Sequence, residues 1–198
     1  MRVGKVVAVI CIAAAKGLLG AQGLMTVVVF DYAAEPDDTV KRAVETAQTP
    51  FRAAGVPTDW WVCRHSDGPN EHCALPAGSY LKVMVVRQWE GHMEGREAMG
   101  LALTLAGKRG IVCYVLVEPS KVLAERTSQP AAVVLGSVMA HEIGHLMGLR
   151  HGPNGIMKPK FERRDIQDAT MGNLHFANGE AKALRALFTE GDAPREVY

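Results

Sequence analysis

The chain contains 198 residues, of which 48% are hydrophobic and 22% charged, and its formal net charge is +1. This length and apolar content suit one globular domain and exclude an intrinsically disordered chain. The near-neutral charge lacks the basic surplus that binding to a phosphate backbone requires, and only 6% of residues are aromatic, so we expect no nucleic-acid partner.

The first 23 residues differ in composition from the rest of the chain. Arg2 and Lys5 precede the apolar run Val6–Ala15, and small residues follow it. A basic start, a short apolar core and a small-residue exit are typical of a secretory signal peptide. We therefore expect residues 1–23 to be a signal peptide and residues 24–198 to form one secreted or periplasmic domain. Candidate cleavage points follow Ala15, Ala21 and Gly23.

Two other interpretations of this N-terminal segment stay open. Residues 3–12 could instead form a buried strand of an intracellular protein, or the segment could be an uncleaved anchor. Lys16 interrupts the apolar stretch well short of the roughly 20 residues that a membrane-spanning helix needs. We therefore expect no stable membrane span.

Three cysteines follow the N-terminal segment. Cys63 and Cys73 flank a polar loop rich in turn-forming residues, and in an oxidising compartment they could close it as a disulfide. A metal site formed by this pair with His65 and His72 is the alternative, but its spacing matches no usual structural zinc pattern. We therefore expect the disulfide. Cys113 lies in an apolar run and is expected to be a buried thiol.

In chain order, the pattern predicts a strand, a long helix, several more strands and then helices. Apolar and β-branched runs predict strands at 26–30, 59–63, 80–86, 99–105 and 111–117. An apolar 3.6-residue pattern that begins at Pro36 predicts a helix, which Pro50 should kink or split. A turn at 107–110 should join two strands as a hairpin. Further helices are expected at about 130–148, near 162–171 and at 178–189. This order favours an α/β domain with a mixed sheet.

Residues 141–151 carry a pattern that points to metal chemistry. His141 and His145 are four residues apart, so a helix places them on one face, where they can hold one metal ion. Glu142 lies about 100° around such a helix from His141, so its carboxylate can reach water at the metal without becoming a ligand. Gly148 is placed to leave the helix with a positive φ, which would bring His151 back as a third ligand.

The type of donor atom indicates the type of metal site. Three neutral imidazoles leave a fourth zinc position open, which is the arrangement of a catalytic rather than a closed structural site. One zinc ion suits this nitrogen-only set best. Histidines that only satisfy hydrogen bonds in a buried helix are the alternative. Three histidines at this spacing, with Glu142 beside them, favour the metal site.

The run His141–His151 resembles the extended zinc signature of the metzincin metallopeptidases, with every fixed position matched. Met157, in the sequence Gly-Ile-Met, resembles the Met-turn methionine of that clan, which lies beneath the metal site without binding zinc. The pattern at 156–159 is closest to that of the matrixins. Gly152, directly after the third histidine, matches none of the common subfamilies.

This resemblance implies a mostly parallel, twisted sheet with an antiparallel edge strand, packed on a central helix that binds zinc. The edge strand would lie along the substrate cleft and would be residues 99–105 here. The candidate substrate-binding residues are therefore Met99, Gly100, Leu101 and Ala102. Residues 158–161 are a further candidate, for one wall of the specificity pocket; an ordinary turn packed beneath the helix is the alternative for this segment.

The function expected from these residues is zinc-dependent hydrolysis of peptide bonds by a secreted, monomeric endopeptidase. Glu142 would act as the general base that takes the water proton and later delivers it to the leaving amine. A peptide or protein substrate would bind by strand addition to the edge strand. Two alternatives stay open: a zinc hydrolase acting on a non-protein amide such as a cell-wall peptide, and a non-catalytic zinc-binding module on the same scaffold.

Overall fold

The computed structural model describes residues 23–64, 73, 75–89, 98–104 and 110–189. Almost all of the predicted signal peptide, His65 and His72, and the Leu105 end of the predicted edge strand lie outside the described residues. The elements are β1 (Met25–Asp31), α1 (Asp37–Ala53), β2 (Thr58–Arg64), β3 (Leu81–Val86), β4 (Gly100–Leu103), β5 (Val112–Leu116), α2 (Val117–Thr127), α3 (Ala131–Leu146), the 3-10 turn η2 (Gly155–Met157), α4 (Arg163–Thr170) and α5 (Asn178–Thr189).

The five strands form one mixed sheet in the order β2-β1-β3-β5-β4. β1, β2, β3 and β5 are parallel, and β4 pairs antiparallel with β5 at the edge, with Gly100 opposite Val115. The interior strand β1 carries a run of valines that is buried on both faces, as is usual for parallel strands. The predicted mixed sheet with its antiparallel edge strand is therefore confirmed.

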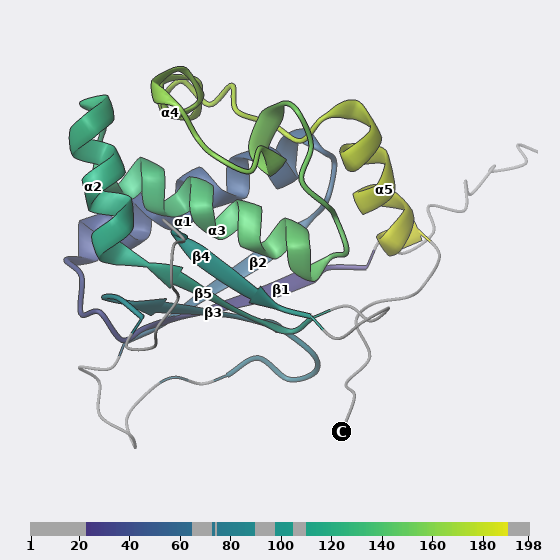
Figure 1. Ribbon diagram of the computed structural model, residues 1–198. Coiled ribbons are helices and arrows are strands. Elements are labelled where there is room, and N and C mark those ends of the chain that lie inside the picture. The colour runs from purple at the N-terminus through teal and green to yellow at the C-terminus, as the bar shows by residue number, and fades with distance from the viewer. Residues whose placement is uncertain (1–22, 65–72, 74, 90–97, 105–109, 190–198) are drawn as a thin grey trace, which may run out of the picture.

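The described helices lie on one side of the sheet, with α3 crossing it next to α1 and with α4 farther out (Figure 1). α3 is buried almost all round, because the sheet, α1 and α4 cover it on different sides. Gly136 permits the close approach of α3 to α1: a Cβ atom there would lie 2.7 Å from Cβ of Thr46 and would also overlap the carbonyl oxygen of Ala43. This packing fixes the helix that carries the histidine motif over the sheet.

The structure corrects two details of the predicted elements. α1 runs to Ala53 without a break at Pro50, so the helix is not split. Pro50 removes one N–H donor from the helix, and only three helical residues follow it, so little of the helix lies beyond the proline. α2 was not predicted, because the apolar strand passes directly into it without a glycine or proline turn. Leu116 is both the last residue of β5 and the N-cap of α2, and Pro119 lies in the first helical turn, where proline is tolerated.

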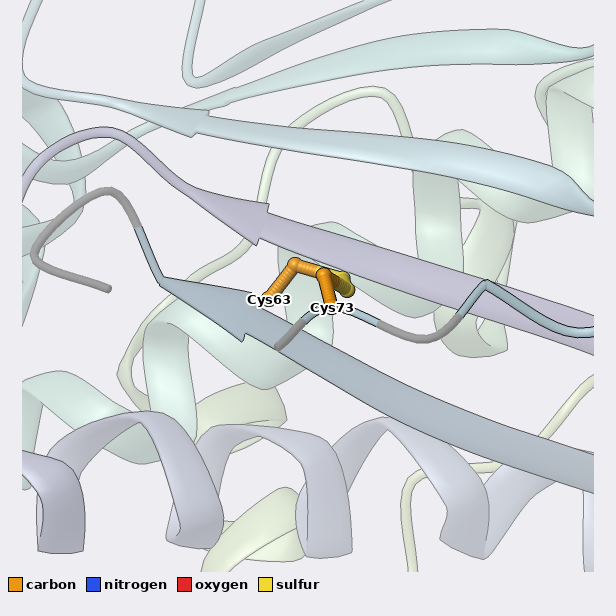
Figure 2. The surroundings of a disulfide bond; sticks show 2 residues. All are labelled: Cys63 and Cys73. Carbon is orange, nitrogen blue, oxygen red and sulfur yellow. A yellow bond between two sulfur atoms is a disulfide. The ribbon is translucent and has the colours of Figure 1, made fainter. Parts of the chain in front are cut away.

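Cys63, near the end of β2, forms a disulfide with Cys73, as predicted (Figure 2). The bond joins the end of β2 to a segment that runs back beside β1 (Figure 2). Sulfur atoms bonded in this way are not available as thiolate ligands, so the structure favours the disulfide over the alternative metal site. Cys113 is a free, buried thiol on β5, also as predicted. Within the part of the chain that the structure describes, every helix is too short or too polar to cross a membrane.

Candidate metal centre

The three histidines of the motif converge at the C-terminal end of α3. His141 and His145 lie one turn apart on the helix, and the chain leaves it at Gly148, whose φ of +90° is the left-handed conformation expected from the sequence. The turn that follows brings His151 back to the other two. The Nε2 atom of His145 lies 3.0 Å from that of His141 and 3.1 Å from that of His151.

Hydrogen bonds to backbone carbonyl groups set the tautomers of two of these rings. Nδ1 of His141 lies 2.8 Å from the carbonyl oxygen of Ile156, and Nδ1 of His145 lies 2.9 Å from that of Leu149. A carbonyl oxygen only accepts, so each Nδ1 carries the hydrogen atom and each Nε2 presents a lone pair. Backbone partners of this kind orient metal-binding histidines in many proteins. The sequence motif did not indicate either carbonyl group.

The donor set fits a metal ion. Two Nε2 lone pairs only 3.0 Å apart repel each other unless a cation lies between them. A proton is a poor candidate, because burial lowers the pKa of His141 to about 4, and burial also lowers that of His145. The Nε2 atoms of all three histidines lie within 4.8 Å of one another. His141, His145 and His151 could therefore hold one metal ion, and three neutral imidazoles are a donor set that suits zinc.

Met157 lies directly against the helix between the first two histidines. Its side chain is fully buried, and a Cβ atom on Gly144 would lie 2.5 Å from its sulfur. The 3-10 turn that carries Met157 is anchored to the segment before α5, because the N–H of Ile156 donates to the carbonyl oxygen of His175 at 2.9 Å. The turn thus supplies both the methionine beneath the histidines and the carbonyl group that orients His141.

Glu142 is 6% exposed and reaches from α3 to the edge strand. A Cβ atom on Gly100 would lie 2.6 Å from Oε1 of Glu142, and the backbone N–H of Ala102 donates to this carboxylate. Burial raises the pKa of Glu142 to about 7, and the hydrogen bond from Ala102 partly opposes that rise. The carboxyl group is therefore balanced between its two protonation states near neutral pH, as a group that takes and returns a proton should be.

The candidate substrate-binding residues divide between the two sides of β4. Gly100 and Ala102 pair with Val115 and Cys113 and lie on the side of the sheet that faces α3, whereas Leu101 lies on the opposite side. The carbonyl oxygen of Met99 accepts the N–H of Leu116 and is used inside the sheet. In an antiparallel pair, the backbone groups of successive residues point alternately toward the partner strand and away from it. Because those of Met99 point toward β5, those of Gly100 and Ala102 point to the open edge of the sheet.

The segment after Met157 also contacts the histidines. Phe161 is 4% exposed, and its ring meets that of His141 edge-on with the centroids 5.8 Å apart. A buried Phe161 against His141 fits an ordinary turn packed against the helix as well as a wall of the specificity pocket, so that wall stays a prediction. Lys158 does not face the histidines and instead pairs with Asp165 of α4 at 2.7 Å, a contact that sequence spacing did not indicate.

Comparison with known proteins identifies the family. The family model of the matrixins matches residues 61–186, which is more than half of the chain. The chain belongs to the matrixin family. This confirms the resemblance to the metzincin-type zinc metallopeptidases that the histidine motif and Met157 indicated.

The fold of this matrixin is similar to that of a solved structure, archaemetzincin from Methanopyrus kandleri. The two share 16% sequence identity with a TM-score of 0.51, and the match covers 85% of this chain and 96% of the other. At this identity the likeness concerns the fold alone. No curated protein sequence gives a significant match.

Proposed function

We propose that this matrixin is a secreted or periplasmic zinc endopeptidase. The observation that carries the proposal is the convergence of three imidazole Nε2 atoms beside a buried carboxylate that touches the open edge of the sheet. His141, His145 and His151 would hold the zinc ion, and Glu142 would be the general base. A zinc ion in this place supplies Lewis-acid chemistry, since it polarises a carbonyl group and acidifies water.

Glu142 is placed for proton transfer by its neighbours. Gly100 leaves room for the carboxylate, and the N–H of Ala102 fixes one of its oxygen atoms. In the ionised form Glu142 would take a proton from water, and in the neutral form it would return that proton to the leaving amine. Burial supports both steps, because it brings the pKa of Glu142 to about 7.

The open edge of β4 would bind the substrate. An extended peptide that pairs with the backbone groups of Gly100 and with the carbonyl oxygen of Ala102 continues the sheet by one strand, which brings its own amide groups next to Glu142. The N–H of Ala102 stays with Glu142. Main-chain hydrogen bonds of this kind hold a peptide without selecting its sequence. Selection would fall to side chains near the metal ligands, such as Phe161.

Two substitutions test the assignment of these roles. Glu142→Gln should keep one zinc ion per chain and lower kcat on a cleaved peptide by about 10²- to 10⁴-fold, the usual contribution of a general base. His141→Ala should lose zinc, as measured by metal analysis of the dialysed protein. Full activity of the Glu142→Gln protein would contradict the role of Glu142 as general base. Unchanged zinc content in His141→Ala would contradict the role of His141 as a zinc ligand.

A peptide library tests the reaction itself. The zinc-loaded protein, with and without a chelator, should cleave a subset of peptides only when the chelator is absent. Cleavage of cell-wall peptides alone would favour the alternative of a non-protein amide as substrate. A protein that binds zinc and cleaves neither would overturn the proposed peptidase activity in favour of a non-catalytic module.

Export is supported by the composition of the N-terminal segment and by the Cys63–Cys73 disulfide, since disulfides persist mainly in oxidising compartments. Expression of the full chain followed by N-terminal sequencing of the protein outside the cytoplasm tests this. We expect a new N-terminus after Ala15, Ala21 or Gly23. Retention of the whole chain in the cytoplasm would contradict the proposal.

A further inference from the structure

Residues 158–162 form a short arch between the 3-10 turn η2 and α4, and both ends of this arch are tied to one carboxylate. Nζ of Lys158 lies 2.7 Å from Oδ2 of Asp165, and the backbone N–H of Glu162 donates to the same oxygen atom, also at 2.7 Å. The second bond is part of a capping box at the start of α4. Asp165 therefore fixes the arch at its first and last residues.

The arch contacts the first histidine of the metal centre. Phe161 is buried within it and places its ring edge against the ring of His141. Immediately before the arch, the carbonyl oxygen of Ile156 accepts the hydrogen bond from Nδ1 of His141. The orientation of His141 and the position of the apolar surface beside it thus depend on one continuous segment, which Asp165 holds in place.

The ion pair between Lys158 and Asp165 is largely shielded from water. The Lys158 side chain is 21% exposed and that of Asp165 is 13% exposed, so water screens the pair much less than an exposed surface pair. The hydrogen bond that Lys158 donates to Asp165 raises the pKa of Lys158, so the lysine stays charged at neutral pH. Charge-assisted hydrogen bonds of this length are stronger than neutral ones.

We propose that Lys158 and Asp165 are positioning residues for substrate selection: their ion pair fixes the arch, and the arch sets the place of Phe161 beside the metal centre. This inference rests on the proposed peptidase function for its kinetic consequence and on the contacts alone for its structural consequence. Loosening the arch moves an apolar surface next to the reacting groups, where displacements of about 1 Å can change rates by about 100-fold.

The kinetic test compares Lys158→Met with Lys158→Arg. Methionine keeps an unbranched apolar side chain and loses the charge, whereas arginine keeps the charge and should rescue the ion pair. Lys121→Met is the matched control, because Lys121 forms a similar pair with Glu35 at 2.9 Å from α2 and contacts none of the histidines. The substrates are peptides that differ only in the size of one apolar side chain beside the cleaved bond.

For Lys158→Met we expect kcat/KM on the best peptide to fall by about 10- to 100-fold, with the ratio between best and worst peptides collapsing toward one. Zinc content should stay at one ion per chain. Lys158→Arg and Lys121→Met should both retain the wild-type peptide ratio. If Lys158→Met does not fold, Asp165→Asn repeats the test. The asparagine loses the charge of Asp165, but its amide oxygen can still accept the hydrogen bond from the N–H of Glu162.

A second readout does not depend on hydrolysis. The ring of Phe161 should shift the NMR signals of the His141 ring protons in the zinc-loaded protein, because it meets that ring edge-on, and Phe161→Leu would identify the shift. Lys158→Met should reduce the shift, and Lys121→Met should leave it unchanged. If the wild-type protein cleaves no peptide, the peptidase proposal fails while this readout still tests the arch. An unchanged His141 signal or an unchanged peptide ratio in Lys158→Met would overturn the positioning role.

Discussion

Gly100 and Gly144 are needed beside the metal centre for the space they leave, not for their backbone conformation. Neither Gly100 nor Gly144 has a positive φ, yet a Cβ atom at either position would overlap a neighbouring functional side chain. Gly100 leaves room for the carboxylate of Glu142, and Gly144 leaves room for the sulfur of Met157. Single methyl groups at these positions therefore probe the alignment of the centre without changing its chemistry.

Gly100→Ala should impair catalysis more than folding. The added Cβ atom would lie 2.6 Å from Oε1 of Glu142, and the end of a side chain moves more easily than a strand. We expect kcat/KM on a cleaved peptide to fall by about 100-fold, with zinc content and the unfolding midpoint nearly unchanged. The control is Gly179→Ala, whose Cβ atom would meet nothing within 4 Å. Wild-type activity of Gly100→Ala would show that the carboxylate is not confined by β4.

At the scale of elements, the position of α3 depends on its contact with α1. Gly136 lies where the two helices approach most closely, and a methyl group there would meet the backbone of Ala43, which cannot rotate away. α3 is also bounded by β4 through Glu142, so the helix has contacts on opposite sides. Separation of α3 from α1 would change the distance between the histidines and the edge strand.

Gly136→Ala should destabilise the protein by about 1–3 kcal/mol, the usual cost of forcing extra atoms into a packed interior. The measurement is urea unfolding of the zinc-loaded protein. Gly179→Ala in α5 is the control and should slightly stabilise the protein, because alanine is the better helix former and the site is open. Equal free energies of unfolding for wild type and Gly136→Ala would refute the close helix contact.

The disulfide is a second element-scale feature, because it joins the end of β2 to the segment at Cys73. Its removal by Cys63→Ser with Cys73→Ser should lower the free energy of unfolding by about 3 kcal/mol. Without the crosslink the unfolded chain has more conformational entropy, and this entropy stabilises the unfolded state by about that amount for a loop of this length. Urea unfolding with and without a reductant provides the measurement. The reductant should lower the urea midpoint of the wild type and leave the midpoint of the double variant unchanged. A wild-type midpoint that does not respond to the reductant would contradict a stabilising disulfide.

At the scale of the whole molecule, the metal centre links segments that are far apart in the sequence. α3 supplies two histidines, the turn after Gly148 supplies the third, η2 supplies the methionine, and β4 confines Glu142. A metal ion that binds only this folded arrangement stabilises it through mass action. Stability should therefore depend on zinc concentration.

Removal of zinc should lower the thermal midpoint of the protein. At a free zinc concentration 100 times Kd, the bound ion would contribute about 2.7 kcal/mol to the free energy of unfolding. Differential scanning calorimetry with zinc and with a chelator measures the shift. In His145→Ala, zinc should no longer raise the thermal midpoint. If zinc raised the midpoint of this variant as much as that of the wild type, the metal ion would bind elsewhere.

The sequence by itself determined the parts of this protein whose signals are local. Spacing of four and then six residues identified His141, His145 and His151, alternation and β-branching identified the strands, and the turn-rich loop identified the Cys63–Cys73 pair. Such features depend on the periodicity of helices and strands, which is the same in every fold. α2 was the exception, because no turn residue separates it from β5.

Only the tertiary structure decided what surrounds those residues. The carbonyl group of Ile156 at His141, the gap that Gly100 leaves for Glu142 and the pairing of Lys158 with Asp165 join separate elements. The physical reason is that these contacts depend on how the elements pack in three dimensions, and no periodicity along the chain encodes those distances. The motif named the histidines and Glu142, and the packing set the tautomers of His141 and His145 and the pKa values of His141 and Glu142.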